Sequence, residues 1–238
     1  MTTLLLATML SLVVWTQQTP PGDGLQFTIK VEAAKVGEGY PTALPAGRAE
    51  MEVVTDGKSI VVTLHGQMGG LPDGLISLTP AGGSVWYRID PQDRTYQVKE
   101  MVSPRAKAGE SARIVATQIF DTIDGHRAQK FLLSSGGSAT DGQKTSPGRP
   151  QTSVIEEVWC SSEFKIPSRV TEITNPALAY LDTDGARQFA RSCPLALKVV
   201  QHVPASPDAG VVRLVTSIRR VSPSPDAFKV PPSYRRLQ

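Results

Sequence analysis

Residue types that hold metals or act as nucleophiles are scarce in this chain of 238 residues, which has only 3 histidines and 2 cysteines. The histidines lie far apart, at positions 65, 126 and 202, and no H-E-x-x-H or paired-cysteine zinc spacing occurs. The sequence therefore predicts no metal site and no cofactor, unless folding brings histidines of separate strands together.

The motifs of common hydrolases and nucleotide-binding enzymes are also absent. The segment nearest to the nucleophile pattern G-x-S-x-G is "GESAR" at residues 109–113, and it ends in arginine. Glu156 and Glu157 are consecutive in a predicted strand, so their side chains point to opposite faces and cannot form a glycosidase pair. No P-loop or G-x-G-x-x-G is present. These absences predict a protein with no catalytic residues, which is not an enzyme.

Long hydrophobic runs are absent after residue 20. The one apolar run, "LLLATMLSLVVW" at residues 4–15, is shorter than the roughly 20 residues that a membrane-spanning helix needs. Its length is typical of a secretory signal peptide, which we predict over residues 1–19. The mature protein is then periplasmic or extracellular. No basic residue precedes the run and no A-x-A site follows it, so an uncleaved anchor and a wrongly assigned start codon stay open as alternatives.

Charge of one sign is not in large excess, because the net charge is +3. No stripe of lysine and arginine with interleaved aromatic residues occurs, a pattern that is typical of nucleic-acid-binding proteins. We predict no nucleic-acid partner.

The two cysteines, Cys160 and Cys193, fit one disulfide in an exported protein. Closing a loop of about 33 residues would stabilise the fold by roughly 3–4 kcal/mol on the chain-entropy account. Two buried free thiols are the alternative.

Turn-forming residues, by contrast, are plentiful: 20 glycines and 19 prolines favour many short elements joined by turns. Alternation of side chains predicts about ten strands. Asp56-Gly57 and Asp124-Gly125 each separate two such strands and predict tight hairpins, because both turn residues must tolerate a positive φ. Residues 135–152 are rich in glycine, serine and proline and predict a flexible surface loop.

One region, residues 175–194, has a helical pattern. Asn175 can cap the helix, Pro176 suits its first position, and Pro194 ends it. Gly185 is expected to divide the region into two short helices.

The order of these elements predicts an α+β fold in which a curved antiparallel sheet surrounds a helical element, in a single domain over residues 24–238. Several strands are apolar on both faces, such as "IVVTL" and "VWYRI". A strand of this kind needs cover on one side and a core or a ligand space on the other.

Five segments occur in this order over roughly residues 84–235: "VWYRIDPQDRTYQV", "DTIDGHRAQKFLL", "EEVWCSSEFKIP", "CPLALKVV" and "SIRRVSPSPDAFKVPPSYRR". The last segment places Phe228, Val230, Pro231 and Tyr234 in the spacing F-x-V-P-x-x-Y. This ordered pattern and its ending resemble a family of bacterial envelope proteins of unknown function.

That family is similar in shape to the periplasmic lipoprotein carriers and their receptors (LolA/LolB-like). The resemblance implies an incomplete β-barrel with one or two helices as a lid over an apolar cavity. It implies lipid, acyl-chain or lipoprotein handling only indirectly, because a fold does not fix a function. The arginine of the carriers' chaperone loop has no match in this sequence.

The leading prediction is an exported, non-enzymatic envelope protein that binds a lipid, an acyl chain or an envelope protein partner in such a cavity. The predicted cavity-lining residues are Trp86, Phe120, Phe131 and Trp159, for which ordinary core packing is the alternative. A packed barrel that serves as a surface interaction or structural protein is the second hypothesis. An envelope hydrolase is the third.

Overall fold

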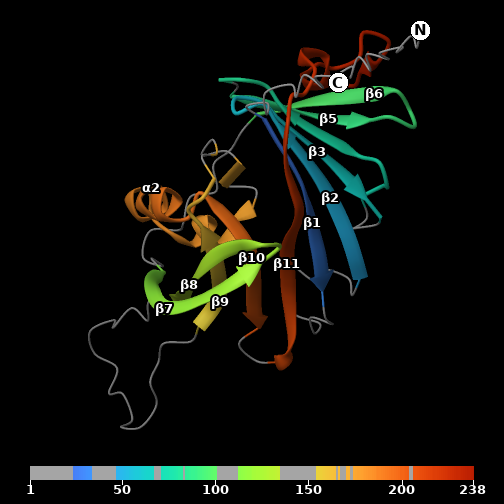
Figure 1. Ribbon diagram of the computed structural model, residues 1–238. Helices are drawn as coiled ribbons and strands as arrows, with labels where there is room; N and C mark the ends of the chain where they lie inside the picture. Colours follow the sequence, from blue (N-terminus) through green and yellow to red (C-terminus); the bar gives the residue numbers. More distant parts are fainter. Residues whose placement is uncertain are drawn as a thin grey trace, which may run out of the picture.

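The computed structural model describes residues 24–33, 47–66, 71–82, 84–100, 112–134, 154–164, 166, 170–171, 174–203 and 206–238. The predicted signal peptide (1–19) and the predicted loop (135–152) lie outside these residues. Twelve strands form one curved, open sheet (Figure 1). Its first six strands are β1 (Gly24–Ala33), β2 (Gly47–Thr55), β3 (Ile60–His65), β4 (Ile76–Thr79), β5 (Val85–Asp90) and β6 (Thr95–Glu100). The other six are β7 (Arg113–Ile123), β8 (His126–Ser134), β9 (Val154–Ser161), β10 (Leu195–Val203), β11 (Ser206–Val221) and β12 (Arg235–Arg236).

The strand order across the sheet is β12-β6-β5-β4-β3-β2-β1-β11-β10-β9-β8-β7. The sheet thus consists of two meanders, β1–β6 and β7–β11, which are joined where β1 pairs with the 16-residue β11 (Figure 1). Neighbouring strands are antiparallel except β12, which runs parallel to β6. The predicted curved antiparallel sheet is confirmed, but the strand count of about ten is too low. The strands not predicted are the four-residue β4 and the two-residue β12, which are too short to show an alternating pattern.

Both predicted hairpins are present, but only the second has the predicted two-residue turn. Asp124 and Gly125 have φ +50° and +80° between the paired residues Ile123 and His126. In the first hairpin Thr55 pairs with Ile60, so residues 56–59 form the loop, and only Gly57 has a positive φ, +85°. Aspartate and glycine tolerate these left-handed conformations better than other residues do. In the first turn, Asp56 Oδ1 also accepts hydrogen bonds from the backbone N–H groups of Lys58 and Ser59.

The helical region is divided, but not where the sequence predicted. A 3₁₀ helix, η1 (Pro176–Tyr180), precedes α2 (Thr183–Ser192), and the break falls at Leu181–Asp182. Asp182 caps α2 by accepting a hydrogen bond from Gly185 N at 2.7 Å. Gly185 therefore lies in the first helical turn, where it does not interrupt the hydrogen-bond ladder. Asn175 makes no side-chain cap. A second 3₁₀ helix, η2 (Pro225–Phe228), follows β11.

Three apolar clusters fill the structure. The first packs alternate residues of β1, including Phe27 and Ile29, against residues that include Trp159 and Leu197. The second packs β8, β9 and β10 against η1 and α2. The third joins Leu78, Ile89 and Phe228 near the C-terminal segment. Among the described residues, no helix has both the length and the apolar character needed to cross a membrane.

Candidate functional site

The face of β8–β11 that η1 and α2 cover is the candidate site, and we call it the helix-covered face. The strand register places Leu133 opposite Glu156, Glu156 opposite Gln201, and Val199 opposite both Val158 and Arg213. Paired residues of neighbouring strands project to the same side of a sheet. This face therefore has two halves. The apolar half consists of side chains from β8, β9 and β10, and the polar half, toward the start of β9, consists of Glu156, Gln201 and Arg213.

The apolar half of the face contacts the helices directly. Phe131 and Phe189 pack edge to face, with ring centroids 5.2 Å apart. Phe189 is the one buried residue of α2. The other members of the cluster are Leu133, Val158, Cys160, Ala177, Leu181, Cys193, Ala196 and Val199.

Glu156 is the most unusual residue of the polar half. It is fully buried, at 0% exposure, and neither carboxyl oxygen has a hydrogen-bond partner. Burial raises the pKa of Glu156 to about 7, although the positive charge of Arg213 opposes that shift. A buried charge without a partner is costly, so burial favours the neutral acid. Perturbed carboxyls of this kind are concentrated at functional sites.

Three further polar side chains lie close to Glu156. Gln201 Nε2 donates a hydrogen bond to the Tyr180 hydroxyl at 2.9 Å, so the end of η1 lies over β10. Burial and then the nearby Glu156 raise the pKa of Tyr180. Burial lowers the pKa of Arg213, whereas Glu156 and Tyr180 act in the opposite direction. The site thus contains one cation, one carboxyl and two neutral donors.

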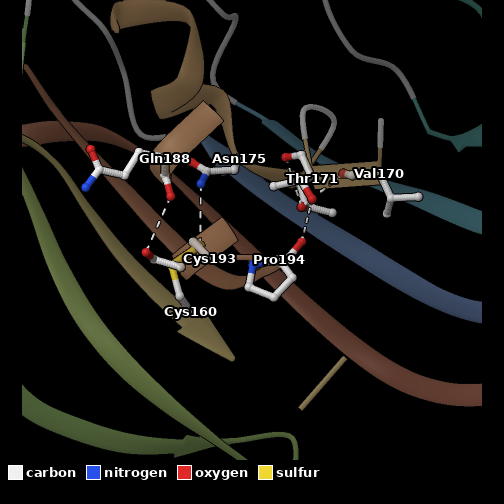
Figure 2. Close-up of a disulfide and its surroundings, with 9 residues drawn as sticks. Cys160, Val170, Thr171, Asn175, Gln188, Cys193 and Pro194 are labelled. Carbon is white, nitrogen blue, oxygen red and sulfur yellow. Dashed lines mark hydrogen bonds between the residues drawn. A yellow bond between two sulfur atoms is a disulfide. The ribbon is translucent and has the colours of Figure 1, made fainter. Parts of the chain in front are cut away.

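A disulfide between Cys160 and Cys193 fixes the far end of the helical region to β9 (Figure 2). This confirms the predicted pairing. Asn175 Nδ2 donates to Cys193 Sγ at 3.5 Å, and Thr171 Oγ1 donates to the carbonyl oxygen of Pro194 at 2.7 Å. The C-terminal end of α2 is therefore held covalently. The η1 end is held by the Gln201–Tyr180 hydrogen bond and by Ala112 N, which donates to Tyr180 O at 3.2 Å.

The opposite face of the same strands is basic and aromatic. The ammonium groups of Lys130 and Lys198 lie 5.0 Å and 4.7 Å from the ring centroid of Trp159. Lys130 Nζ also contacts Glu157 Oε2 at 2.7 Å, and His202 Nε2 lies 3.3 Å from Glu157 Oε1. Burial alone would raise the pKa of Glu157, but hydrogen bonds and charge from Lys130 and His202 together lower it. This face therefore holds an ion-pair group centred on Glu157.

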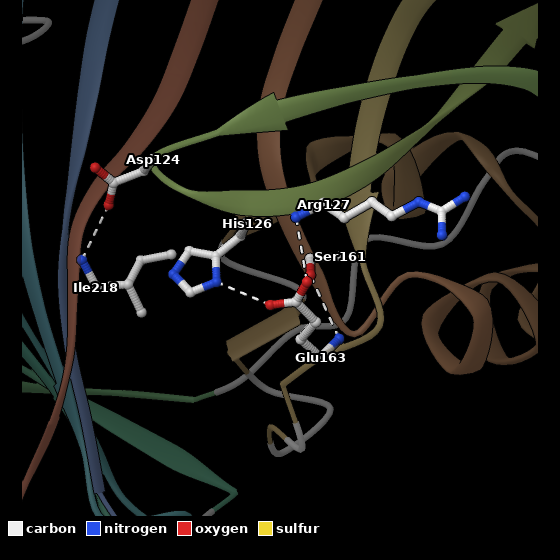
Figure 3. A network of polar contacts seen from close by, with 6 residues as sticks. All are labelled: Asp124, His126, Arg127, Ser161, Glu163 and Ile218. Carbon is white, nitrogen blue, oxygen red and sulfur yellow. Dashed lines mark hydrogen bonds and ion pairs between the residues drawn. The ribbon is translucent and has the colours of Figure 1, made fainter.

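A second polar network fixes the tip of the β7–β8 hairpin (Figure 3). Ile218 N donates to Asp124 Oδ2 at 3.2 Å, which joins the tip to β11. Glu163 accepts hydrogen bonds from His126 Nδ1 at 2.9 Å and from Arg127 N at 3.1 Å, and both bonds lower the pKa of Glu163. The three histidines stay apart: His65 pairs with Glu52, His126 with Glu163, and His202 with Glu157. In the part of the chain that the structure describes, no three metal-binding side chains come together.

The structure does not bring the four predicted cavity-lining residues together. Phe131 is on the helix-covered face, whereas Trp159, next in sequence to Val158, is on the opposite face. Phe120 is 45% exposed on β7, with the Arg127 guanidinium 4.4 Å from its ring centroid. Trp86 is half-buried on β5, in the other meander.

Sequence reasoning did not single out Glu156 or Arg213 as functional residues. Each occupies an interior position in an otherwise apolar alternation: Glu156 precedes Val158 and Cys160, and Arg213 lies between Val211 and Val215. The signal was a charged residue in a strand that is apolar on both faces, although in β9 this signal does not say which of Glu156 and Glu157 is the buried one.

Comparisons with known proteins do not show which family this chain belongs to. No protein-family model matches it, and no curated protein matches its sequence. A crystal structure of an uncharacterized conserved protein from Thermus thermophilus is similar, with a TM-score of 0.48 and 9% identity over 91% of this chain and 90% of that chain. A crystal structure of a LolA superfamily protein from Nitrosomonas europaea has a TM-score of 0.38 and 10% identity over 88% of this chain and 91% of the other. Neither likeness assigns this chain to a family, and the family named from the sequence stays a prediction.

Proposed function

We propose that this chain is a non-enzymatic, exported protein of the bacterial envelope that holds an acyl chain between α2 and the helix-covered face. The observation that carries the proposal is the shallow attachment of α2. Only Phe189 of its ten residues is buried, with Ala186 partly buried, and both pack against an apolar cluster to which three strands contribute. We expect an acyl chain to enter between α2 and this cluster, beside Phe189.

The restraints on the helical region suit a lid. The disulfide anchors the C-terminal end of α2 to β9, while the η1 end is held by the two hydrogen bonds of Tyr180 and by apolar contacts of Ala177, Leu178 and Leu181 with the second cluster. These contacts are all non-covalent, so the η1 end is the one that we expect to separate from the sheet while the other end stays fixed. The disulfide also fits an oxidising compartment, as the predicted export requires.

Lipid analysis and a neutral probe test this function. Native mass spectrometry of gently purified protein should show a bound lipid, and delipidated protein should take up a pyrene-labelled monoacylglycerol, which carries no charge. Leu178→Glu places a carboxylate from η1 against the second cluster and should weaken uptake at least tenfold. Phe120→Glu, at an exposed position of β7, is the matched control and should bind like the wild type. Wild-type protein that is empty and takes up no probe would refute the proposal.

A partner-binding function is the second candidate, and one observation favours it. Strand β7 is an edge of the sheet and exposes Val115, Ile119 and Phe120, with Ile119 54% exposed. Exposed edges with apolar side chains are available for pairing with other chains. Chemical cross-linking of the protein to an envelope partner tests this candidate. If Ile119→Lys abolishes the cross-linked product and leaves acyl uptake unchanged, the result supports partner binding through β7 and separates it from the first candidate.

A further inference from the structure

Strand β7 is the most exposed long strand at an edge of the sheet. It is the last strand in the order across the sheet, so within the described sheet it pairs with β8 alone. Ile123 is the one buried residue among its eleven. Of the large apolar side chains that the structure describes, four are exposed, and three of these, Val115, Ile119 and Phe120, lie on β7. The strand therefore presents a backbone edge together with apolar side chains, which is the combination that pairs with another strand.

The opposite edge of the sheet has the features that normally prevent such pairing. Strand β12 has only two residues, Arg235 and Arg236, and both are exposed. A very short, charged edge strand is a common protection against association between sheets. In β7, by contrast, the charged residues Arg113 and Asp121 flank an uncharged centre. Strand β7 is therefore the edge of this sheet that is suited to an interface.

The charges of β7 are complementary when two copies of the strand run antiparallel. Arg113 and Asp121 are both exposed and are equally far in sequence from Thr117. If Thr117 of both copies lies on a two-fold axis, Arg113 of one copy lies opposite Asp121 of the other at each end of the interface. Opposite charges in directly facing positions stabilise a pair of antiparallel strands. This charge pattern identifies a second copy of the chain as the partner that fits β7.

The apolar side chains match in the same register. The pairing of β7 with β8, and of β8 with β9, puts Ile114 and Phe120 on the helix-covered face and Val115 on the opposite face. A two-fold axis perpendicular to the sheet keeps each face on its own side. Ile114 of one copy then meets Phe120 of the other, and Val115 meets Ile119. The exposed apolar side chains of each copy are therefore covered by those of the second copy.

The middle of β7 bulges, and the register accommodates the bulge. Residues 117–119 lie opposite Lys130 alone. Thr117 Oγ1 donates a hydrogen bond to the carbonyl oxygen of Lys130 at 2.8 Å and accepts one from Ile119 N at 3.1 Å, so the bulge satisfies polar groups of its own. In the two-fold register the bulges of both copies lie at the axis. Backbone pairing is then needed only toward the two ends of the strands.

We infer that β7 packs antiparallel against β7 of a second copy about a two-fold axis, so that the chain forms a homodimer whose sheet continues from one copy into the other. The inference goes beyond acyl binding. It rests on the second candidate function, binding through β7, and names the partner as another molecule of this chain. A two-fold interface uses the β7 edge of both copies, and the charged β12 ends the sheet on each side, so association stops at the dimer.

Charge reversal tests the dimer by sedimentation velocity, with circular dichroism as the check that each variant folds. The wild type should show a concentration-dependent equilibrium between monomer and dimer. Arg113→Asp and Asp121→Arg should each raise the dissociation constant of the dimer by roughly tenfold, because like charges then face each other at both ends of the interface. An equimolar mixture of these two variants should form a mixed dimer. The double variant Arg113→Asp/Asp121→Arg should regain the dimer of the wild type.

Rescue of this kind can arise only between copies. Positions 113 and 121 of one strand are more than about 20 Å apart, since each residue of a strand advances it by about 3.3 Å, so their side chains cannot contact each other. Arg236→Asp reverses an exposed arginine at the other edge of the sheet and should leave the dimer unchanged.

The outcomes also separate this inference from the function on which it rests. A wild type that stays monomeric at its highest soluble concentration would refute the dimer, and so would a dimer that neither charge reversal weakens. If a different envelope protein is then cross-linked and Ile119→Lys abolishes that product, binding through β7 stands with another partner. If no cross-linked product forms either, the second candidate function is wrong as well.

Discussion

Glu156 and Glu157 are consecutive in β9, yet the first carboxyl is fully buried without a hydrogen-bond partner and the second lies 2.7 Å from Lys130 Nζ. Their pKa values move in opposite directions, to about 7 for Glu156 and below the ordinary value for Glu157. The pair therefore supplies a test with an internal control.

Glu156 should make the folded protein less stable as the pH rises. In the unfolded chain its pKa returns to the ordinary 4.5, so between pH 4.5 and about 7 the folded protein retains a proton that the unfolded chain has lost. The free energy of unfolding falls across this window by about 3 kcal/mol for one such group and levels off above it. In urea unfolding at pH 5 and pH 8, Glu156→Gln should remove this decrease and be the more stable protein at pH 8.

Glu157 should show the opposite dependence. Its lowered pKa stabilises the folded protein above pH 4.5, and this contribution is lost as the pH falls through the folded-state pKa. Glu157→Gln should therefore destabilise the protein at pH 8 and have little effect at pH 3. Equal pH profiles for the two variants would show that the two carboxyls do not differ as described.

Removal of the disulfide should cost about 4 kcal/mol in the free energy of unfolding, because the bond closes a loop with a sequence separation of 33. The double variant Cys160→Ala/Cys193→Ala should show this loss in urea unfolding. A reductant should destabilise the wild type by a similar amount and leave the double variant unchanged. Limited proteolysis of the double variant should also cut within Thr183–Ser192, since the anchored end of α2 is released.

Phe189→Ala should destabilise the protein by about 3–5 kcal/mol, the usual cost of truncating a buried phenylalanine. A double-mutant cycle with Phe131→Ala should give a coupling of about 1 kcal/mol, because the two rings pack edge to face. Phe120→Ala is the control: its ring is half exposed, and the change should cost less than about 1 kcal/mol. Zero coupling in the cycle would mean that α2 does not pack on β8 in solution.

Asp124 should be replaceable by asparagine but not by alanine. Both Asp and Asn tolerate the φ of +50° at this position and can accept the hydrogen bond from Ile218 N, whereas Ala disfavours that φ and has no side-chain acceptor. In thermal unfolding we expect a loss of about 1–2 kcal/mol for Asp124→Ala and less than half of that for Asp124→Asn. Similar losses for both variants would show that the charge of Asp124 is what matters.

Local signals in the sequence predicted the parts of the fold that depend on local chemistry. The two hairpins follow from aspartate and glycine at turn positions, and the disulfide follows from two cysteines in a chain with a predicted export signal. The break in the helical region was predicted at Gly185 because glycine has a low helix propensity, but it lies at Leu181–Asp182. In the structure, Asp182 accepts a hydrogen bond from Gly185 N, so glycine fits the first turn.

The site was harder to predict because its strands are apolar on both faces. In "SVIEEVWC", Ile155, Glu157 and Trp159 alternate as readily as Glu156, Val158 and Cys160 do. Alternation therefore could not decide which glutamate faces η1. That choice depends on the register with β8 and β10, and on the helices that cover one side, which are both long-range features. The same ambiguity affects Phe131 and Trp159.

The pairing of β1 with β11 has a consequence for the time course of folding. Gln26 and Arg219 are joined although they are 193 positions apart, while β2–β6 and β7–β10 meet mainly through near neighbours in sequence. Closing so long a loop is entropically slow, so both meanders should collapse before they join. Until then, the edges of β1 and β11 that pair with each other in the folded protein remain free. At high concentration these edges can pair with other molecules, which leads to strand exchange and aggregation.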